Sequence, residues 1–177
     1  VMVNGEKFHT RKIIIATGSR PVVPEPWQSL GKRLLTTDTL FEQEALPERI
    51  AVIGMGPVGL EMAQALSRLG VRVTGFGSGR MIGGITDPLI NQAAVTLLSK
   101  EFSLHLGTRA DITVNADSDV ITVNSGDIRI EVDSVLAALG RRPNIDDINL
   151  EALGVPLDER GLPPVNPDTL QIADLPV

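Results

Sequence analysis

RIAVIGMGPVGLEMAQALSRLGVRVTGF, the sequence of residues 49–76, contains an apolar run, a glycine-rich turn, an amphipathic segment and a second apolar run without a gap. Residues 50–53 are typical of a short strand, and apolar residues then recur at helical spacing from Pro57 until Gly70. The apolar residues at this spacing are Val58, Met62, Ala65, Leu66 and Leu69. Residues 71–74 alternate apolar and polar side chains. This order predicts a strand, a helix and a parallel strand, as in doubly wound α/β sheets.

The turn between the first strand and the helix has the glycine spacing of a dinucleotide-binding loop. In such a loop Gly54 would allow the tight exit from the strand, Gly56 would let backbone N–H groups approach a pyrophosphate, and Gly59 would let the helix pack closely. The helix dipole adds partial positive charge at the same place. The residues expected to bind the dinucleotide are Gly54, Gly56, Pro57, Val58 and Gly59. The simpler alternative is a βαβ unit with an empty loop.

The composition limits the classes of function. The chain has 177 residues, 42% of them hydrophobic, and a mean hydropathy of +0.13, which suit one domain with fragments of a second. A net charge of −6 argues against nucleic-acid partners. The absence of cysteine and the presence of only two histidines argue against disulfides, redox thiols and metal clusters in these residues. No run approaches the roughly 20 apolar residues of a membrane span. We therefore expect a cytoplasmic location, and a chain that is part of a longer protein.

Further strands and helices are expected on both sides of this stretch. Near-continuous apolar runs that end in glycine, at 13–18, 51–54 and 135–140, predict strands buried on both faces of a parallel sheet. We expect a short helix over 38–43, capped at Thr37, and a longer one from Asp87 to about Lys100. A third parallel strand is expected at 104–106, with His105 on a face of the sheet.

Alternating residues then predict a different arrangement. The segments 112–114, 120–123 and 128–132 alternate apolar and polar residues and are separated by turn residues, which favours an antiparallel meander. Beyond residue 143 only 150–153 predicts a helix. The expected fold class is α/β, a Rossmann-like parallel sheet with an excursion into an antiparallel β-meander.

The order of the motifs IIIATGSRP (13–21), AVIGMGPVGLE (51–61), LAALGRRPN (136–144) and DTLQIADLPV (168–177) resembles a known family. It is similar to the FAD-dependent pyridine nucleotide-disulfide oxidoreductases, the group of dihydrolipoamide dehydrogenase, glutathione reductase and mercuric reductase. The resemblance implies that residues 22–142 form an NAD(P)-binding domain inserted into an FAD-binding domain. Residues 1–21 would be a remnant of that FAD-binding domain, and residues 143–177 an incomplete return to it. These are the remnants expected at both ends of the Rossmann-like fold.

The resemblance also implies an activity and its partners. NAD(P)H would exchange hydride with FAD, which would pass electrons to a disulfide or a related acceptor, such as lipoamide, a metal ion or a quinone. Thr17, Gly18 and Arg141 would lie near FAD, and Gly140 near the dinucleotide. The full-length protein would be a homodimer whose FAD-binding and dimerisation domains are missing from this chain. The chain alone is therefore expected to bind the dinucleotide without turnover.

Glu61 and the end of the second strand bear on how the dinucleotide would be held. Glu61 resembles a family glutamate that orients the nicotinamide, although it could also be a simple charge near a helix start. A carboxylate usually binds the adenosine ribose about 20 residues after the first glycine, but here Gly77 stands there. Ser78 and Arg80 could instead bind a 2′-phosphate, which favours NADPH over NADH. Against this, Gly59 is more common in NAD-type loops.

Two alternatives come from other classes of protein. A non-catalytic nucleotide-sensing module would need the same glycine-rich loop, but not the ATG and GRRPN motifs. The other alternative is a flavin-dependent NAD(P)H oxidoreductase without a redox disulfide, because these residues contain no cysteine and so give no information about redox thiols elsewhere in the protein.

Overall fold

The computed structural model describes residues 1–114, 120–173 and 175, and the chain divides into two units. We call Pro21–Arg142 the sheet unit. Val1–Arg20 together with Pro143–Val177 form the terminal unit. Each unit is described by itself below.

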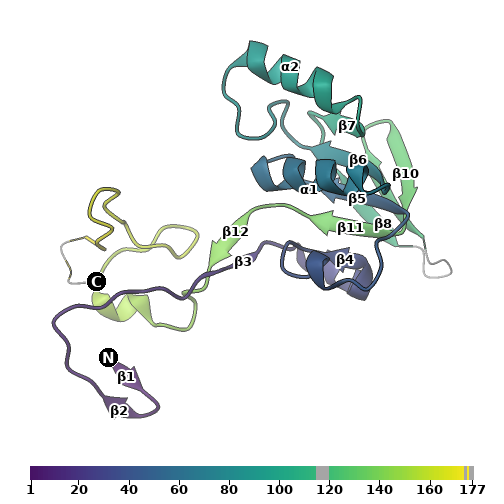
Figure 1. Cartoon of the computed structure of the whole chain (residues 1–177). Helices are drawn as coiled ribbons and strands as arrows, with labels where there is room; N and C mark the ends of the chain where they lie inside the picture. Colours follow the sequence, from purple (N-terminus) through teal and green to yellow (C-terminus); the bar gives the residue numbers. More distant parts are fainter. Residues whose placement is uncertain (115–119, 174, 176–177) are drawn as a thin grey trace. The chain divides into compact units, whose positions relative to one another are not determined.

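A five-stranded parallel sheet forms the centre of the sheet unit (Figure 1). Its order is β4 (Leu34–Leu35), β11 (Ser134–Ala137), β5 (Arg49–Ile53), β6 (Arg72–Gly77) and β7 (Ser103–Leu106). Helix α1 (Pro57–Arg68) connects β5 to β6, and α2 (Pro88–Leu98) connects β6 to β7. The predicted α/β class and its parallel sheet are confirmed.

Strand β5 shows why an apolar run specifies this sheet. Its residues Ile50 to Ile53 are all buried, and they alternate between two hydrophobic clusters on opposite faces of the sheet. Ile50 and Val52 join the cluster that contains Ala63 and Leu66 of α1. The other face of the sheet packs against the meander and the 3₁₀ helix η1 (Glu25–Arg33). The sheet is thus the middle layer of three, which explains why its central strands are apolar on both faces.

The meander consists of β8 (Asp111–Val114), β9 (Ile121–Ser125) and β10 (Ile128–Val132), paired antiparallel in the order β10-β9-β8. Ile121 and Val123 of β9 are completely buried, which explains the apolar half of the alternation. The predicted meander is confirmed, while the expected separator 115–119 lies outside the described residues.

The limits of α1 agree with the sequence, but its buried face does not. Pro57 begins the helix and Gly70 ends it with φ of +91°, while the Val71 N–H donates to the Leu66 carbonyl. The buried residues are Gly59, Ala63 and Leu66, whereas Val58 is 44% and Leu69 is 70% exposed. Of the other apolar residues at helical spacing, Met62 is partly buried and Ala65 is exposed. The buried face is thus offset by about one residue from the apolar stripe, and the close contact predicted for Gly59 lies on that buried face.

Two other expectations were wrong. Residues 13–18 belong to no strand, and Ile14 is 90% exposed. An apolar run becomes a strand only when neighbouring strands bond to it, and no described strand does so here. The helix expected at 38–43 is the single 3₁₀ turn η2 (Leu40–Glu42), preceded by a turn in which the Thr36 N–H donates to Thr39 Oγ1.

Helix α2 and strand β7 follow the sequence closely. Asp87 caps α2 through hydrogen bonds from the N–H groups of Leu89 and Ile90. His105 lies in β7 and stacks on Phe76 of β6, with 5.3 Å between ring centroids, which confirms its place on a face of the sheet.

The terminal unit has little regular structure. Strands β1 (Met2–Val3) and β2 (Glu6–Lys7) form a hairpin, and η3 (Leu150–Leu153) is a 3₁₀ turn at the predicted position. Strand β3 (Ser19–Pro21) pairs with β12 (Arg141–Pro143) where the chain passes from one unit to the other, so this pair belongs to neither unit alone. Among the described residues, no helix combines the length and the apolar character needed to cross a membrane.

Candidate functional site: the glycine-rich loop of the sheet unit

The glycine-rich loop lies at the carboxyl end of β5, where the direction of the sheet's connections reverses. From β5 the chain continues to β6 and β7 on one side, whereas β11 and β4 lie on the other side. In open α/β sheets ligands bind at the carboxyl edge beside such a switch point. The topology therefore makes the edge between the ends of β5 and β11 the candidate site.

Gly54 is required by the protein's own packing. Its φ is +106°, and a Cβ there would lie 2.2 Å from the carbonyl oxygen of Ala138. Its N–H donates to the Phe76 carbonyl at 2.8 Å. The ends of β11 and β6 thus enclose this residue, and a larger side chain cannot be accommodated.

Gly59 is also required by packing, at the point where α1 meets the loop. A Cβ there would lie 1.8 Å from the Gly54 carbonyl oxygen and 3.2 Å from the Ala138 Cβ. This contact seats the first turn of α1 directly against the end of β5.

Gly56 differs, because nothing in the protein requires a glycine there. Its φ of −70° suits any residue, and a Cβ would meet no atom within 4 Å. Gly56 is the N-cap of α1 and supplies no side-chain cap, which leaves N–H groups of the first turn without that partner. Open space beside an uncapped helix start fits a bound diphosphate, and so does the positive end of the helix dipole.

The loop that follows β6 is held by backbone hydrogen bonds. The Gly107 N–H donates to the carbonyls of Gly77 at 2.9 Å and Gly79 at 3.2 Å. The Gly83 N–H donates to the Met55 carbonyl at 2.8 Å, which ties this loop to the glycine-rich loop. The two loops therefore form one structure at the carboxyl edge of the sheet.

Asn91 of α2 fixes the middle of the same loop, and the sequence analysis did not identify it. Its amide oxygen accepts from the Ile82 N–H at 2.9 Å, and its amide nitrogen donates to the Arg80 carbonyl at 3.2 Å. Asn91 is only 8% exposed. The one available signal was a polar residue among apolar ones in the first turns of α2, which is too common to indicate a role.

Ser78 and Arg80, the side chains expected near the adenosine ribose, lie in the loop after β6. Both are exposed; Ser78 directly follows the buried Gly77 at the end of β6, and Arg80 comes two residues later. The Arg80 side chain passes over Gly107, where a Cβ would lie 3.4 Å from its Cγ. Within the part of the chain that the structure describes, its guanidinium forms no ion pair with a carboxylate.

Glu61 lies in the second turn of α1, since the first turn contains no acidic residue. Its side chain is exposed, and among the described residues it forms no hydrogen bond or ion pair. The macrodipole effect fades beyond the first turn. Glu61 therefore gains little from the helix dipole, and its exposed position fits a solvated surface charge as well as a contact to a ligand.

Arg141 is held within the sheet unit. It follows Gly140, whose φ is +95° and whose carbonyl accepts from the Val22 N–H. The Arg141 guanidinium donates to Asp38 Oδ1 at 2.9 Å and to Thr37 Oγ1 at 3.1 Å. The hydrogen bond from Arg141 is the main cause of a pKa of the Asp38 carboxyl below its usual value. The structure thus gives Arg141 an ion-pair partner that the sequence did not predict.

In the terminal unit, Asn144 joins the motif IIIATGSRP to the motif LAALGRRPN. Its backbone N–H donates to the Gly18 carbonyl at 2.9 Å, and its amide nitrogen donates to the Thr17 carbonyl at 3.1 Å. Its amide oxygen accepts from Arg20 Nη1 at 3.0 Å. Segments more than 120 residues apart in the sequence are thereby bonded through their motif residues.

Comparison with known proteins agrees with this combination of motifs. The model of the pyridine nucleotide-disulphide oxidoreductase family matches residues 1–172. The chain belongs to this family. Members of the family are oxidoreductases that use FAD and NAD(P)H.

Three similar proteins illustrate the relationship. Mercuric reductase from Staphylococcus aureus is 33% identical over 91% of this chain and 30% of its own length. Dihydrolipoyl dehydrogenase from Manduca sexta is 33% identical over 94% of this chain and 36% of its own. The structure of the HOCl-induced flavoprotein disulfide reductase RclA from Escherichia coli superposes with a TM-score of 0.77 at 26% identity, covering 90% of this chain and 37% of that one. The chain thus spans about a third of the length of these pyridine nucleotide-disulphide oxidoreductases.

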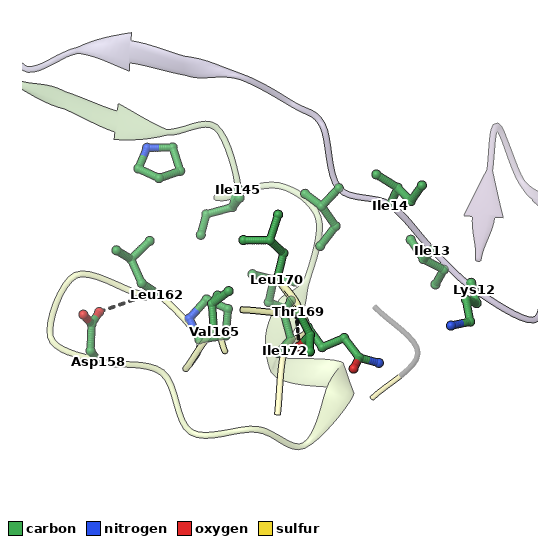
Figure 2. A pocket seen from close by; sticks show the side chains of 15 residues that line it. Lys12, Ile13, Ile14, Ile145, Asp158, Leu162, Val165, Thr169, Leu170 and Ile172 are labelled. Carbon is green, nitrogen blue, oxygen red and sulfur yellow. Dashed lines mark hydrogen bonds between the residues drawn. The ribbon is translucent and has the colours of Figure 1, made fainter. Parts of the chain in front are cut away.

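An apolar pocket of about 980 Å³ lies in the terminal unit of this family member (Figure 2). Side chains of Ile13, Ile145, Leu162 and Ile172 line it, and most of its lining is apolar. Its one carboxylate, Asp158, accepts hydrogen bonds from the N–H groups of Arg160 and Leu162. The pocket therefore presents mainly hydrophobic surface, and Lys12 is the basic residue in its lining.

No described group of three or more histidine, cysteine, aspartate or glutamate side chains has a geometry that could hold a metal ion.

Proposed function

We propose that the sheet unit is the NAD(P)H-binding domain of an FAD-dependent oxidoreductase that resembles dihydrolipoamide dehydrogenase. The observation that carries the proposal is Gly56, which has open space around its Cα although its conformation would tolerate a side chain. A bound pyrophosphate explains why that space is kept free. The protein's own packing explains only Gly54 and Gly59.

Each part of the site would have a separate task. The first-turn N–H groups of α1, including those of Val58 and Gly59, would hold the pyrophosphate in the field of the helix dipole. Glu61, exposed and unpaired among the described residues, would orient the nicotinamide. Gly140 would leave room for the dinucleotide between β11 and the loop. When bound, the dinucleotide supplies hydride for exchange with FAD, and a disulfide or a related acceptor takes up the electrons.

The terminal unit would belong to the FAD-binding domain. The hydrogen bonds from Asn144 to Thr17 and Gly18 support this, because they bring the outgoing and returning motif segments together as one structural element. The apolar pocket and the exposed Ile14 would pack against the remainder of that domain. Arg141 would remain near FAD while paired with Asp38. The full-length protein would form a homodimer, and this chain alone would bind the dinucleotide without turnover.

The residues expected beside the adenosine ribose favour NADPH over NADH. No carboxylate occurs between residues 70 and 86, and Ser78 and Arg80 are both exposed beside the end of β6. A guanidinium without an acidic partner among the described residues is suited to bind a 2′-phosphate.

The nucleotide-sensing module is the less favoured alternative. Such a module would need only the sheet unit, whereas the family match extends through the terminal unit to residue 172. The oxidoreductase explains both units.

The test is a calorimetric titration of the chain with NADH and with NADPH. We expect Gly56→Val to abolish binding of both, because its side chain would fill the space of the pyrophosphate. It should leave the melting temperature almost unchanged, since a Cβ at Gly56 meets no protein atom within 4 Å.

Ala65→Val provides the matched control, because Ala65 is exposed on the same helix but away from its start. This variant should bind both dinucleotides like the wild type. Normal binding by a folded Gly56→Val variant would contradict the assignment of the loop.

A further inference from the structure

The second residue of the glycine-rich loop, Met55, is buried rather than turned toward solvent. Its exposed fraction is 4%, and it belongs to the hydrophobic cluster between the sheet and the helices. A large side chain at this point of a tight loop needs space in the neighbouring strand. The structure shows where that space comes from.

Strand β6 provides the space by having glycines on one face. Gly75 and Gly77 are two residues apart, so their missing side chains would have pointed to the same face of the sheet. A Cβ at Gly75 would lie 2.7 Å from the Met55 Sδ and 3.1 Å from its Cε. Glycine inside a strand costs stability and often marks a close approach by another group. Here the approaching group is the Met55 thioether.

Gly77 is closed to side chains in the same way. A Cβ there would lie 3.3 Å from the Met55 Cβ, 2.9 Å from the Leu106 Cδ2 and 3.4 Å from the Gly79 carbonyl oxygen. The terminal Leu106 methyl group can move, but the Met55 Cβ is attached to the loop backbone and cannot move independently. A carboxylate would also approach the Gly79 carbonyl, which repels it. Gly77 is the position at which Rossmann folds commonly carry an acidic residue for the ribose 2′-OH.

We infer that Met55 is a specificity-determining residue: by packing over Gly75 and Gly77, it excludes an acidic side chain from the end of β6. Recognition of the ribose is thereby left to Ser78 and Arg80. This inference rests on the proposed dinucleotide function and adds the physical reason for the missing carboxylate. The ligand class that fits is a dinucleotide with a phosphate on its adenosine ribose.

The structural part of the inference can be tested without ligand, by measuring melting temperatures of Met55→Gly, which removes the Met55 Cβ itself, of Gly77→Glu and of the double variant. We expect each single change to lower the melting temperature, the first by leaving a cavity and the second by overpacking. The double variant should lose clearly less than the sum, because the space left by Met55 accommodates the glutamate.

Gly79→Glu is the matched control, since a Cβ at Gly79 meets no atom within 4 Å. It adds the same charge two residues away and should be additive with Met55→Gly. Strictly additive losses for Met55→Gly and Gly77→Glu would overturn the packing argument.

The specificity part is tested by calorimetry with NADH and NADPH. The double variant should bind NADH about tenfold or more tightly than Met55→Gly does, as expected for new hydrogen bonds to a carboxylate, and it should bind NADPH more weakly. If Gly77→Glu alone gained the same NADH affinity, or the double variant gained none, the role of Met55 in specificity would be refuted. Failure of the wild type to bind either dinucleotide would instead contradict the proposed function, and the specificity role with it.

Discussion

At the scale of single residues, Asp133 links two neighbouring strands. It directly precedes β11 and bonds to Arg49, the first residue of β5. Its carboxylate accepts hydrogen bonds from the Arg49 backbone N–H at 2.9 Å and from the Arg49 guanidinium. The Asp133 N–H in turn donates to the Arg49 carbonyl at 3.1 Å. The hydrogen bonds from the Arg49 side chain are the largest cause of the lowered pKa of Asp133, and its own burial opposes them.

The lowered pKa of Asp133 makes the stability of the sheet unit depend on pH. A carboxyl with a lower pKa in the folded state stabilises that state above its unfolded pKa of about 3.9. This contribution is lost as the pH falls through the lower, folded-state pKa. We therefore expect Asp133→Asn to lower the melting temperature by a few degrees at pH 7, and by much less at pH 3. Thermal unfolding of both proteins at the two pH values measures this difference.

Asp127→Asn removes an exposed carboxylate in the turn between β9 and β10, and it should leave the melting temperature at pH 7 nearly unchanged. A loss for Asp133→Asn that is equal at pH 3 and pH 7 would show that the ionised carboxylate does not stabilise the fold.

At the scale of secondary-structure elements, helix α2 holds the loop after β6 in place. Its N-cap, Asp87, accepts from the N–H groups of Leu89 at 2.8 Å and Ile90 at 3.0 Å. One turn later, Asn91 holds the backbone of Arg80 and Ile82. The start of α2 is therefore coupled to the loop after β6, and loss of the cap should also loosen that loop.

Asp87→Ala should destabilise the protein by about 1 kcal/mol, the usual cost of losing an N-cap. Urea unfolding measures this cost, and Asp87→Ser, which keeps a capping oxygen, should retain most of the stability. The affinity for NADPH should fall with Asp87→Ala and largely recover with Asp87→Ser. Equal stability of the alanine and serine variants would mean that the cap seen in the structure contributes nothing.

At the scale of the whole molecule, we expect a bound ligand to slow hydrogen exchange in the sheet unit and not in the terminal unit. A ligand that binds only the native state at 100 times its dissociation constant stabilises that state by about 2.7 kcal/mol. If the site lies in the sheet unit, hydrogen exchange should slow on adding NADPH at residues 54–59 and 77–86 and in the first turn of α1. Residues 143–172 of the terminal unit should exchange at an unchanged rate.

Hydrogen–deuterium exchange with peptide-level analysis measures this pattern, and Gly56→Val serves as the control in which NADPH should protect nothing. Protection centred on residues 143–172 would place the ligand in the terminal unit, and would contradict the assignment of the site to the glycine-rich loop.

The sequence by itself determined the strand, loop and helix order of residues 49–76, the capped start of α2 and the meander. These features depend on the spacing of apolar residues, on capping residues and on turn glycines, all of which act within a few residues of the chain. The motif spacing also identified the family and the fold class. The face of α1 that meets the sheet was the exception, because the contact between Gly59 and the Gly54 carbonyl decides it.

Only the tertiary structure decided the contacts between distant segments. It showed Met55 over Gly75 and Gly77, Asn91 bonded to the loop after β6, and Arg141 paired with Asp38. It also showed that residues 13–18 remain outside any strand, although their sequence is as apolar as that of β5. The physical reason is the same in each case. Periodicity reports which side of an element is apolar, whereas a packed contact or a paired strand depends on a partner that local sequence does not specify.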